Sequence, residues 1–201
     1  GLTYTTASRG VVFLYTAPFM IALGAHWFLP GEMLRPQQWL GLACAFAGIL
    51  AAFGESLGLP SQSQLLGDGM LLLAAVLWAA TTLVIKGSRL AKVSPAKTLF
   101  YQLAGSALVL PCVSLALDEP GVIALTPLVL ASLAYQTVLV AFASYLVWFW
   151  LVAHYPAGRL AAFSFLTPLF GVLAGALLLS ERISPALAVA LALVVLGIWL
   201  V

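Results

Sequence analysis

The stretch ASRGVVFLYTAPFMIALGAHWFL, residues Ala7–Leu29, decides how this sequence is interpreted. It contains a single charged residue, Arg9, and it carries Pro18 near its middle. A bilayer core about 30 Å thick is crossed by about 20 apolar helical residues. The stretch is therefore predicted to be a membrane-spanning helix in which Pro18 interrupts the backbone hydrogen bonds.

The rest of the chain has the same character. Of its 201 residues, 64% are hydrophobic and 7% are charged, whereas about 25% charged residues are usual in a soluble domain. This composition excludes a soluble globular domain, a disordered chain and a nucleic-acid-binding protein. Continuous apolar runs without strand alternation predict helices. Seven are predicted, at Gly10–Leu29, Gln37–Gly54, Asp68–Lys86, Lys97–Leu117, Thr126–Val152, Ala157–Leu179 and Ile183–Val201.

Almost all charged residues lie in the short connections between these stretches. Alternate connections fall on the same side of a membrane, and one set holds six cations, namely Arg35, Lys86, Arg89, Lys92, Lys97 and Arg159. The opposite set holds five acidic residues with the cations Arg9 and Arg182. Cytoplasmic connections carry an excess of Lys and Arg, so the six-cation side is predicted to be cytoplasmic. The C-terminus belongs to the same side.

The opening stretch has a counterpart late in the chain. Residues Ala157–Leu179, AGRLAAFSFLTPLFGVLAGALLL, match Ala7–Leu29 at six of 23 positions with an offset of 150 residues. The matches include Arg9/Arg159, Phe13/Phe163 and Pro18/Pro168, and at an offset of 149 they continue through Glu32/Glu181, Pro36/Pro185 and Gly48/Gly197. Composition alone explains matched Leu and Ala, but not this ordered series of Arg, Phe, Pro, Glu and Gly. We interpret it as an internal duplication.

The spacing of the two copies predicts their orientation. They lie five predicted stretches apart, and an odd number of crossings turns the second copy upside down relative to the first. This is the inverted-repeat plan of secondary transporters. The predicted fold is all-α, a polytopic membrane helix bundle with inverted five-helix repeats. Seven spans of an expected ten are present, and the other three are expected upstream of Gly1.

The same segments resemble a known family. The sequence YTTASRGVVFLYTAPFMIALGAHWFLPGE followed by WLGLACAFAGILAAFGE resembles the last two helices of an EamA-type domain of the drug/metabolite transporter superfamily. The sequence HYPAGRLAAFSFLTPLFGVLAGALLLSERIS and the glycine-bearing final helix resemble the same part of a second domain. The resemblance implies the end of a first repeat at 1–55, a linker at 56–67 and a second repeat at 68–201. It further implies an inner-membrane exporter or permease that moves small metabolites, amino acids or drugs by alternating access.

Polar and aromatic side chains within the spans are the candidates for substrate contact, because pockets for small amphipathic ligands combine apolar walls with a few polar groups. The candidates are Tyr15, Trp78, Thr81, Tyr101, Gln102, Gln136, Tyr145, Trp148, Phe163 and Thr167. Pro18 and Pro168 are predicted hinges, since each frees the carbonyl four residues earlier; a simple kink is the alternative. Trp27, Trp39, Trp150 and Trp199 lie near span ends and are interpreted as interfacial anchors.

No catalytic residue, metal site or cofactor is predicted. The sequence lacks GxSxG, HExxH and paired carboxylates at membrane depth, and its two His have no ligand-spaced Cys or Asp. An enzyme is therefore not expected. The expected partners are a small-molecule substrate and the lipid bilayer, without nucleic acid, and a homodimer is left open. Two alternatives to a transporter stay open: a non-transporting membrane assembly subunit, and a truncated seven-span fragment without activity.

Overall fold

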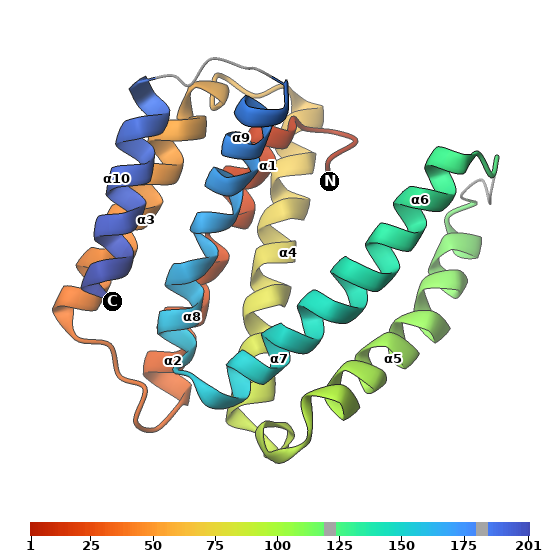
Figure 1. Cartoon of the computed structure of the whole chain (residues 1–201), viewed down its shortest axis with the longest axis horizontal. Helices are drawn as coiled ribbons and strands as arrows, with labels where there is room; N and C mark the ends of the chain where they lie inside the picture. Colours follow the sequence, from red (N-terminus) through yellow and green to blue (C-terminus); the bar gives the residue numbers. More distant parts are fainter. Residues whose placement is uncertain (119–123, 180–184) are drawn as a thin grey trace. The chain divides into compact units, whose positions relative to one another are not determined.

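Helices form all the regular structure that the computed structural model contains in the residues it describes, 1–118, 124–179 and 185–201 (Figure 1). The expectation of an all-α fold is confirmed. The α-helices are α1 (Ala7–Leu14), α2 (Ala17–Phe28), α3 (Pro36–Phe53), α4 (Gln62–Gly87), α5 (Pro95–Ala116), α6 (Pro127–Tyr135), α7 (Tyr145–His154), α8 (Ala157–Ser164), α9 (Leu166–Leu179) and α10 (Pro185–Leu200). Short 3-10 helices follow α3 (η1, Gly54–Ser56) and α4 (η2, Arg89–Lys92), and a π-helical segment (η3, Gln136–Ser144) joins α6 to α7.

Helix lies over each of the seven predicted stretches within the described residues. Among the described residues, five helical segments are long and apolar enough to cross a membrane, and they are Ala7–Phe28, Pro36–Phe53, Gln62–Gly87, Pro95–Ala116 and Pro127–His154. The apolar helix α10 is shorter, with 16 residues. The number of membrane crossings and the inverted arrangement stay predictions. Glu119, Glu181 and Arg182, which the sequence analysis assigned to connections, lie outside the described residues.

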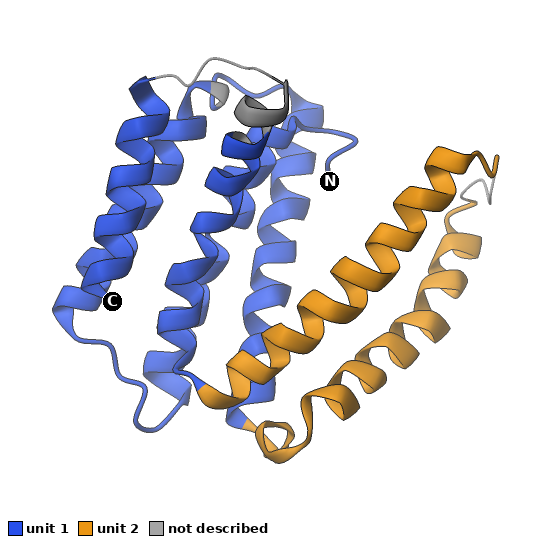
Figure 2. Ribbon diagram, viewed as in Figure 1, with its two compact units in different colours: residues 1–87, 155–201 blue, residues 88–154 orange. Residues whose placement is uncertain are grey.

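The chain divides into two compact units (Figure 2). The first comprises residues 1–87 and 155–201, and therefore contains α1 to α4 and α8 to α10. The second comprises residues 88–154, in which α5 packs against α7. These units are defined by packing and do not follow the repeat boundary predicted at residues 56–67, which stays a prediction.

The first unit has two apolar clusters. The larger joins α1, α2, α3, α8, α9 and α10 around Tyr15, Leu42, Phe165 and Val194. The smaller joins α2, α4 and α8 around Ile21, Ala79 and Ala161. Helices α2 and α8 contribute to both clusters, so the break-bearing segments are packed into the core of the first unit.

Helices α3 and α10 lie side by side and run antiparallel in the first unit (Figure 1). A Cβ atom on Gly41 would lie 2.6 Å from the carbonyl oxygen of Gly197, and a Cβ atom on Gly197 would lie 2.5 Å from that of Gly41. Two turns further along α3, a Cβ atom on Gly48 would lie 2.7 Å from the carbonyl oxygen of Ala190. Glycine is required at these positions because the two backbones touch.

Helix α4 begins earlier than predicted. The expectation was a start at Asp68, but the helix starts at Gln62. Ser61 and Gln64 form a reciprocal cap, in which the Ser61 N–H donates to Gln64 Oε1 (2.9 Å) and the Gln64 N–H donates to Ser61 Oγ (3.3 Å). This capping box satisfies free amides of the first turn. As a result, Asp68 lies inside a helix and not in a connection.

Candidate functional site

Two helix breaks at matching positions of the two similar segments, 150 residues apart, mark the candidate site. Helix α1 ends at Leu14 and α2 begins at Ala17, while α8 ends at Ser164 and α9 begins at Leu166. Pro18 and Pro168 lie just beyond these breaks and have no N–H to donate to the carbonyls of Leu14 and Ser164. The predicted interruption is therefore present in both segments.

Hydroxyl groups satisfy backbone carbonyls beside the breaks. Thr16 Oγ1 donates to the carbonyl oxygen of Phe13 at 2.6 Å. In the second segment, Ser164 Oγ donates to the carbonyl oxygen of Leu160 at 3.3 Å. These bonds supplement the backbone hydrogen bonds of the turns before the breaks, such as the one from the Thr16 N–H to the Phe13 carbonyl oxygen (3.2 Å).

The break residues themselves meet in the core of the first unit. The ring centroids of Tyr15 and Phe165 lie 6.2 Å apart, and the side chain of Tyr15 is 8% exposed. The side chains of Tyr15 and Thr167 lie near each other. Phe19 and Phe46 complete an aromatic cluster, with ring centroids 5.3 Å apart. The structure thus brings together two of the predicted site residues, Tyr15 and Thr167.

The other predicted site residues of the first unit lie on α4 and α8. Trp78 is half-buried, whereas Thr81 is exposed and its hydroxyl donates to the carbonyl oxygen of Leu77 at 2.9 Å. Thr82, which was not among the predicted residues, is buried and donates to the carbonyl oxygen of Trp78 at 3.2 Å. Phe163 is 56% exposed and lines a pocket on α8 instead of joining the aromatic cluster.

The remaining predicted residues belong to the second unit. On α5, Tyr101 is exposed with Lys97 Nζ 5.9 Å from its ring centroid, and Gln102 is half-buried. On α7, Trp148 is half-buried, and the ring centroid of Tyr145 lies 6.0 Å from that of Phe149. Gln136 is exposed at the start of the π-helical segment η3. Sequence reasoning missed this segment, and π-helical turns are frequent at functional sites.

A buried ion pair was also missed. Arg9 on α1 and Asp68 on α4 are 4% and 5% exposed, and the Arg9 guanidinium pairs with the Asp68 carboxylate. Thr5 Oγ1 donates to Asp68 Oδ1 (2.8 Å), and Arg9 Nη1 donates to the carbonyl oxygen of Gly58 (3.0 Å). The sequence analysis had placed Arg9 directly before the span Gly10–Leu29 and Asp68 at the first residue of the span Asp68–Lys86. The Ser-x-x-Gln pattern at Ser61–Gln64 was the sequence signal that could have placed Asp68 inside a helix.

A second ion pair ties three chain segments together. Glu32 Oε1 lies 3.4 Å from Lys86 Nζ, and Glu32 Oε2 accepts a bond from the Ala157 N–H at 2.7 Å. Lys86 Nζ also donates to the carbonyl oxygen of Tyr155 at 2.7 Å. The carboxylate therefore joins the end of α4 to the start of α8, where the helix dipole favours negative charge.

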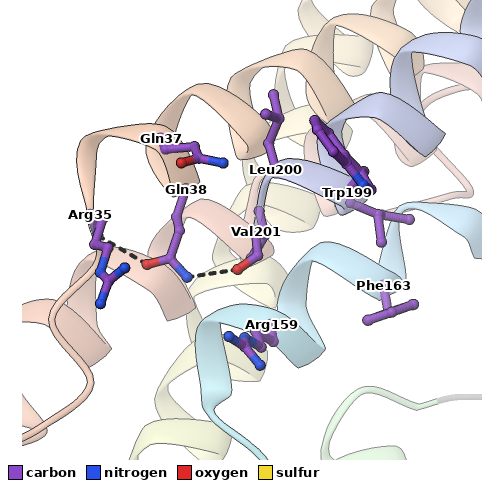
Figure 3. Close-up of a pocket in the computed structure, with 9 residues that line it drawn as sticks. Arg35, Gln37, Gln38, Arg159, Phe163, Trp199, Leu200 and Val201 are labelled. Carbon is purple, nitrogen blue, oxygen red and sulfur yellow. Dashed lines mark hydrogen bonds between the residues drawn. The ribbon is translucent and has the colours of Figure 1, made fainter.

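A polar pocket opens where α3, α8 and α10 meet, with a volume of about 540 Å³ (Figure 3). Its lining residues are Arg35, Gln37, Gln38, Arg159, Phe163, Ile198, Trp199, Leu200 and Val201. Gln38 Oε1 accepts from the Arg35 N–H at 2.9 Å, and Gln38 Nε2 donates to the Val201 carbonyl oxygen at 2.7 Å. Trp199, interpreted as an interfacial anchor, is 77% exposed at the rim.

Known proteins resemble the chain over most of its length. An uncharacterized transporter of Archaeoglobus fulgidus is 25% identical over 90% of this chain and 62% of its own length. A probable amino-acid metabolite efflux pump of Escherichia coli K12 is 30% identical over 83% of this chain and 57% of its own length. A solved crystal structure, 27% identical, superposes on 99% of this chain and 68% of its own length with a TM-score of 0.83.

The chain spans less than two thirds of the length of several relatives that it matches, such as those from A. fulgidus and E. coli. Its apolar helices and these relatives identify it as a multi-pass membrane protein. The profile of one family matches residues 1–54 and 65–201, which is nearly the whole chain. The predicted resemblance is therefore confirmed, and the chain belongs to the EamA-like transporter family.

Proposed function

We propose that the chain forms the substrate-handling part of an inner-membrane transporter for small organic metabolites, built from inverted repeats and working by alternating access. The pair of helix breaks is the observation that carries this proposal. Helices α1 (Ala7–Leu14) and α8 (Ala157–Ser164) have identical bounds when shifted by 150 residues. The break residues Tyr15 and Phe165 are related by the same shift and lie in ring contact.

The contacts between α3 and α10 support the inverted arrangement. A shift of 149 residues carries Gly41 to Ala190 and Gly48 to Gly197. Gly41 and Gly197 are in contact. When the shift is applied forwards to Gly41 and backwards to Gly197, it gives Ala190 and Gly48, and these two residues are also in contact. An exchange of this kind arises when a two-fold axis relates two antiparallel helices. An axis along the membrane normal would relate parallel helices instead, so the proposed axis lies in the membrane plane.

The breaks supply the flexibility that alternating access needs. Pro18 and Pro168 have no N–H, so the helical hydrogen bonds to the carbonyls of Leu14 and Ser164 are missing next to Tyr15 and Phe165. Each segment therefore bends there at low cost. The inverted copies place one break in each repeat. Bending at one break and then at the other opens the two sides of the membrane in turn.

The residues around the breaks favour a small, partly apolar substrate. The aromatic cluster of Tyr15, Phe19 and Phe46 supplies apolar surface, and the hydroxyl groups of Tyr15 and Thr167 supply polar contacts. The sequence-based candidates Trp78 and Thr81 on α4, and Tyr101, Gln102, Gln136, Tyr145 and Trp148 in the second unit, stay predictions for substrate contact. An amino acid or a related metabolite has this mixture of polar and apolar surface, and the E. coli relative is named for amino-acid metabolites.

The test is flux through the protein reconstituted in liposomes. A panel of radiolabelled amino acids, including aromatic and branched ones, is loaded inside, and release is compared with that from protein-free liposomes. Selective release of some members supports the transporter. Release of none would favour the non-transporting membrane subunit, and equal release of all, including the bulky control sucrose, would indicate leakage. A Tyr15→Ala variant that is inserted normally is expected to weaken substrate affinity.

A further inference from the structure

The carboxylate of Glu32 connects the end of α2 to two other helices of the first unit. Pro30 and Gly31 form a tight turn after α2, in which the Glu32 N–H donates to the Leu29 carbonyl oxygen at 3.1 Å. Gly31 has a φ of 90°, a conformation that glycine adopts without strain in such a turn. The turn therefore places Glu32 at a defined position beyond the last residue of the helix.

Both carboxylate oxygens of Glu32 have partners on other helices. Oε1 lies 3.4 Å from Nζ of Lys86, in the last turn of α4, and Oε2 accepts a bond at 2.7 Å from the N–H of Ala157, the first residue of α8. The side chains of Glu32 and Lys86 are 16% and 15% exposed, so water reaches the pair. An ion pair that water reaches is weak, and it can separate and form again at low cost.

The apolar contact beside this ion pair is made mostly of small side chains. It is the smaller cluster of the first unit, in which α2, α4 and α8 contribute Ile21, Ala25, Leu29, Ala79, Ala157 and Ala161. Because each alanine has a single methyl group, separating these helices exposes little apolar surface. The polar contacts of Glu32 are therefore a large part of what keeps this end of the three helices together.

The opposite end of the same segments is held by a stronger contact. Arg9 on α1 pairs with Asp68 on α4, with Arg9 Nε 3.3 Å from Asp68 Oδ1, and the two side chains are 5% and 6% exposed. Separating them would leave two unpaired charges in an apolar environment, which is costly. Asp68 and Lys86 lie 18 residues apart on one continuous helix, or about 27 Å along its axis. One ion pair is therefore fixed, and the other, at the far end of α4, can open.

We propose that Glu32 is a latch that opens during transport. When its carboxylate leaves Lys86 and Ala157, the end of α2 moves away from α4 and α8. Helix α1 stays attached through Arg9, so the segment bends at the break around Tyr15. The latch lies on the side with six cations, which is predicted to be cytoplasmic. Its role in transport rests on the proposed function, but its opening can be measured without a substrate.

The first experiment measures how often the latch opens, from the reaction rate of a buried thiol. Leu29 is 7% exposed, and Leu29→Cys places a thiol beside the latch in a protein whose Cys44 and Cys112 are replaced by Ala. Its reaction with N-ethylmaleimide in detergent should be about three- to tenfold faster when Glu32→Gln or Lys86→Met is added. The two changes together should add little to either one, because both remove the same pair.

Two controls separate the latch from a general loss of stability. Glu55→Gln removes an exposed carboxylate from η1 and should leave the rate at position 29 unchanged. Val194 on α10 is fully buried in the larger cluster, and Glu32→Gln should not change the reaction rate of Val194→Cys. An equal acceleration at positions 29 and 194 would overturn the proposal. An unchanged rate at position 29 in both Glu32→Gln and Lys86→Met would overturn it as well.

The second experiment links the latch to transport through a disulfide. A Cβ atom on Gly87 would lie 2.9 Å from Leu29 Cδ2, so cysteines at these two positions are close enough to be joined by oxidation with copper phenanthroline. In liposomes, oxidised Leu29→Cys/Gly87→Cys should lose flux and regain it after reduction, while oxidised Leu29→Cys should keep it. Full flux through the cross-linked protein would overturn the proposal. If the reduced protein moves no substrate, the transport function fails, and the thiol rates still decide whether Glu32 is a latch.

Discussion

Arg9 on α1 and Asp68 on α4 form a buried ion pair, although 59 residues separate them in the sequence. Every described polar atom of the pair has a partner, with Thr5 and the carbonyl of Gly58 completing the network. A charge in an apolar environment is costly unless it is paired and hydrogen-bonded. The pair therefore fixes how α1 sits against α4.

Removing one member of this pair is expected to destabilise the protein. Asp68→Asn leaves the Arg9 guanidinium buried without its counter-ion, so the midpoint of thermal unfolding in detergent should fall. The fall should exceed that caused by Glu32→Gln, whose ion pair is more exposed. The double variant Arg9→Met/Asp68→Leu should lie closer to the unmodified protein than Asp68→Asn, since replacing both charges avoids an unpaired one. A double variant no more stable than the single one would contradict this account.

The close contact between α3 and α10 makes Gly41 intolerant of a side chain. Gly41→Ala would place a methyl group against the carbonyl of Gly197, and overpacking of this kind costs about 1–3 kcal/mol. Unfolding in detergent by a denaturant series measures the loss. Gly105→Ala on α5 is the matched control, because nothing lies within 4 Å of the added carbon. It should leave stability equal or raise it by up to about 1 kcal/mol, the helix preference of Ala over Gly.

The proline breaks are expected to control the rate of transport and not substrate affinity. Pro18→Ala supplies a backbone N–H that can donate to the carbonyl oxygen of Leu14. The helix can then continue through Tyr15 and becomes stiffer. Conformational steps set the turnover of many proteins that move a segment. Flux assays should give a reduced maximal rate with a half-saturating concentration within about twofold of the unmodified protein. A large change in affinity with unchanged rate would assign Pro18 to binding.

The polar residues of the second unit are expected to contact substrate. Gln102→Leu, Gln136→Leu and Tyr145→Phe each remove one hydrogen-bonding group, which costs roughly 0.5–1.5 kcal/mol or a few-fold to tenfold in affinity. Competition binding or flux at matched expression measures the effect. Trp27→Leu, an exposed position on α2 near a span end, serves as the control and should leave affinity unchanged. If all three variants kept full affinity, these residues would not belong to the site.

The charge distribution predicts the orientation in the membrane. In a protein whose Cys44 and Cys112 are replaced by Ala, Lys92→Cys should resist an impermeant thiol reagent in intact cells, and Asp118→Cys should react. Lys92 lies in the connection with most cations, and Asp118 follows α5 at its opposite end. Labelling at position 92 but not at 118 would reverse the orientation.

The positions of the helices could be predicted from the sequence because membrane spans need long apolar runs that charges and prolines bound. Pro36 and Pro95, for example, occupy the first turns of α3 and α5, where a missing amide costs nothing. The start of α4 was predicted wrongly because Asp68 was read as the edge of the apolar run. The capping box at Ser61 starts the helix at Gln62, and a charge within it is tolerated because Arg9 neutralises it.

The candidate site could be predicted only in part. The match between the two segments singled out Pro18 and Pro168, but it did not predict the contact of Tyr15 with Phe165, although these residues are related by the same offset of 150 residues. The presence of Arg35 and Arg159 in one pocket could not be foreseen, because 124 residues separate them and no local pattern records that α3 and α8 meet. The π-helical turn at Gln136–Ser144 has no distinctive composition, since its residues also suit an α-helix.

The first unit is discontinuous in the chain, and this affects the order in which it can be assembled. Helix α3 is synthesised early, but its antiparallel neighbour α10 is made from the last residues of the sequence. At about 5–20 residues per second, the ribosome needs several seconds or more to supply it. During that interval α10 is not available to pack against Gly41 and Gly48. A chain that ended before Pro185 would therefore lack the backbone contacts that join α3 to α10.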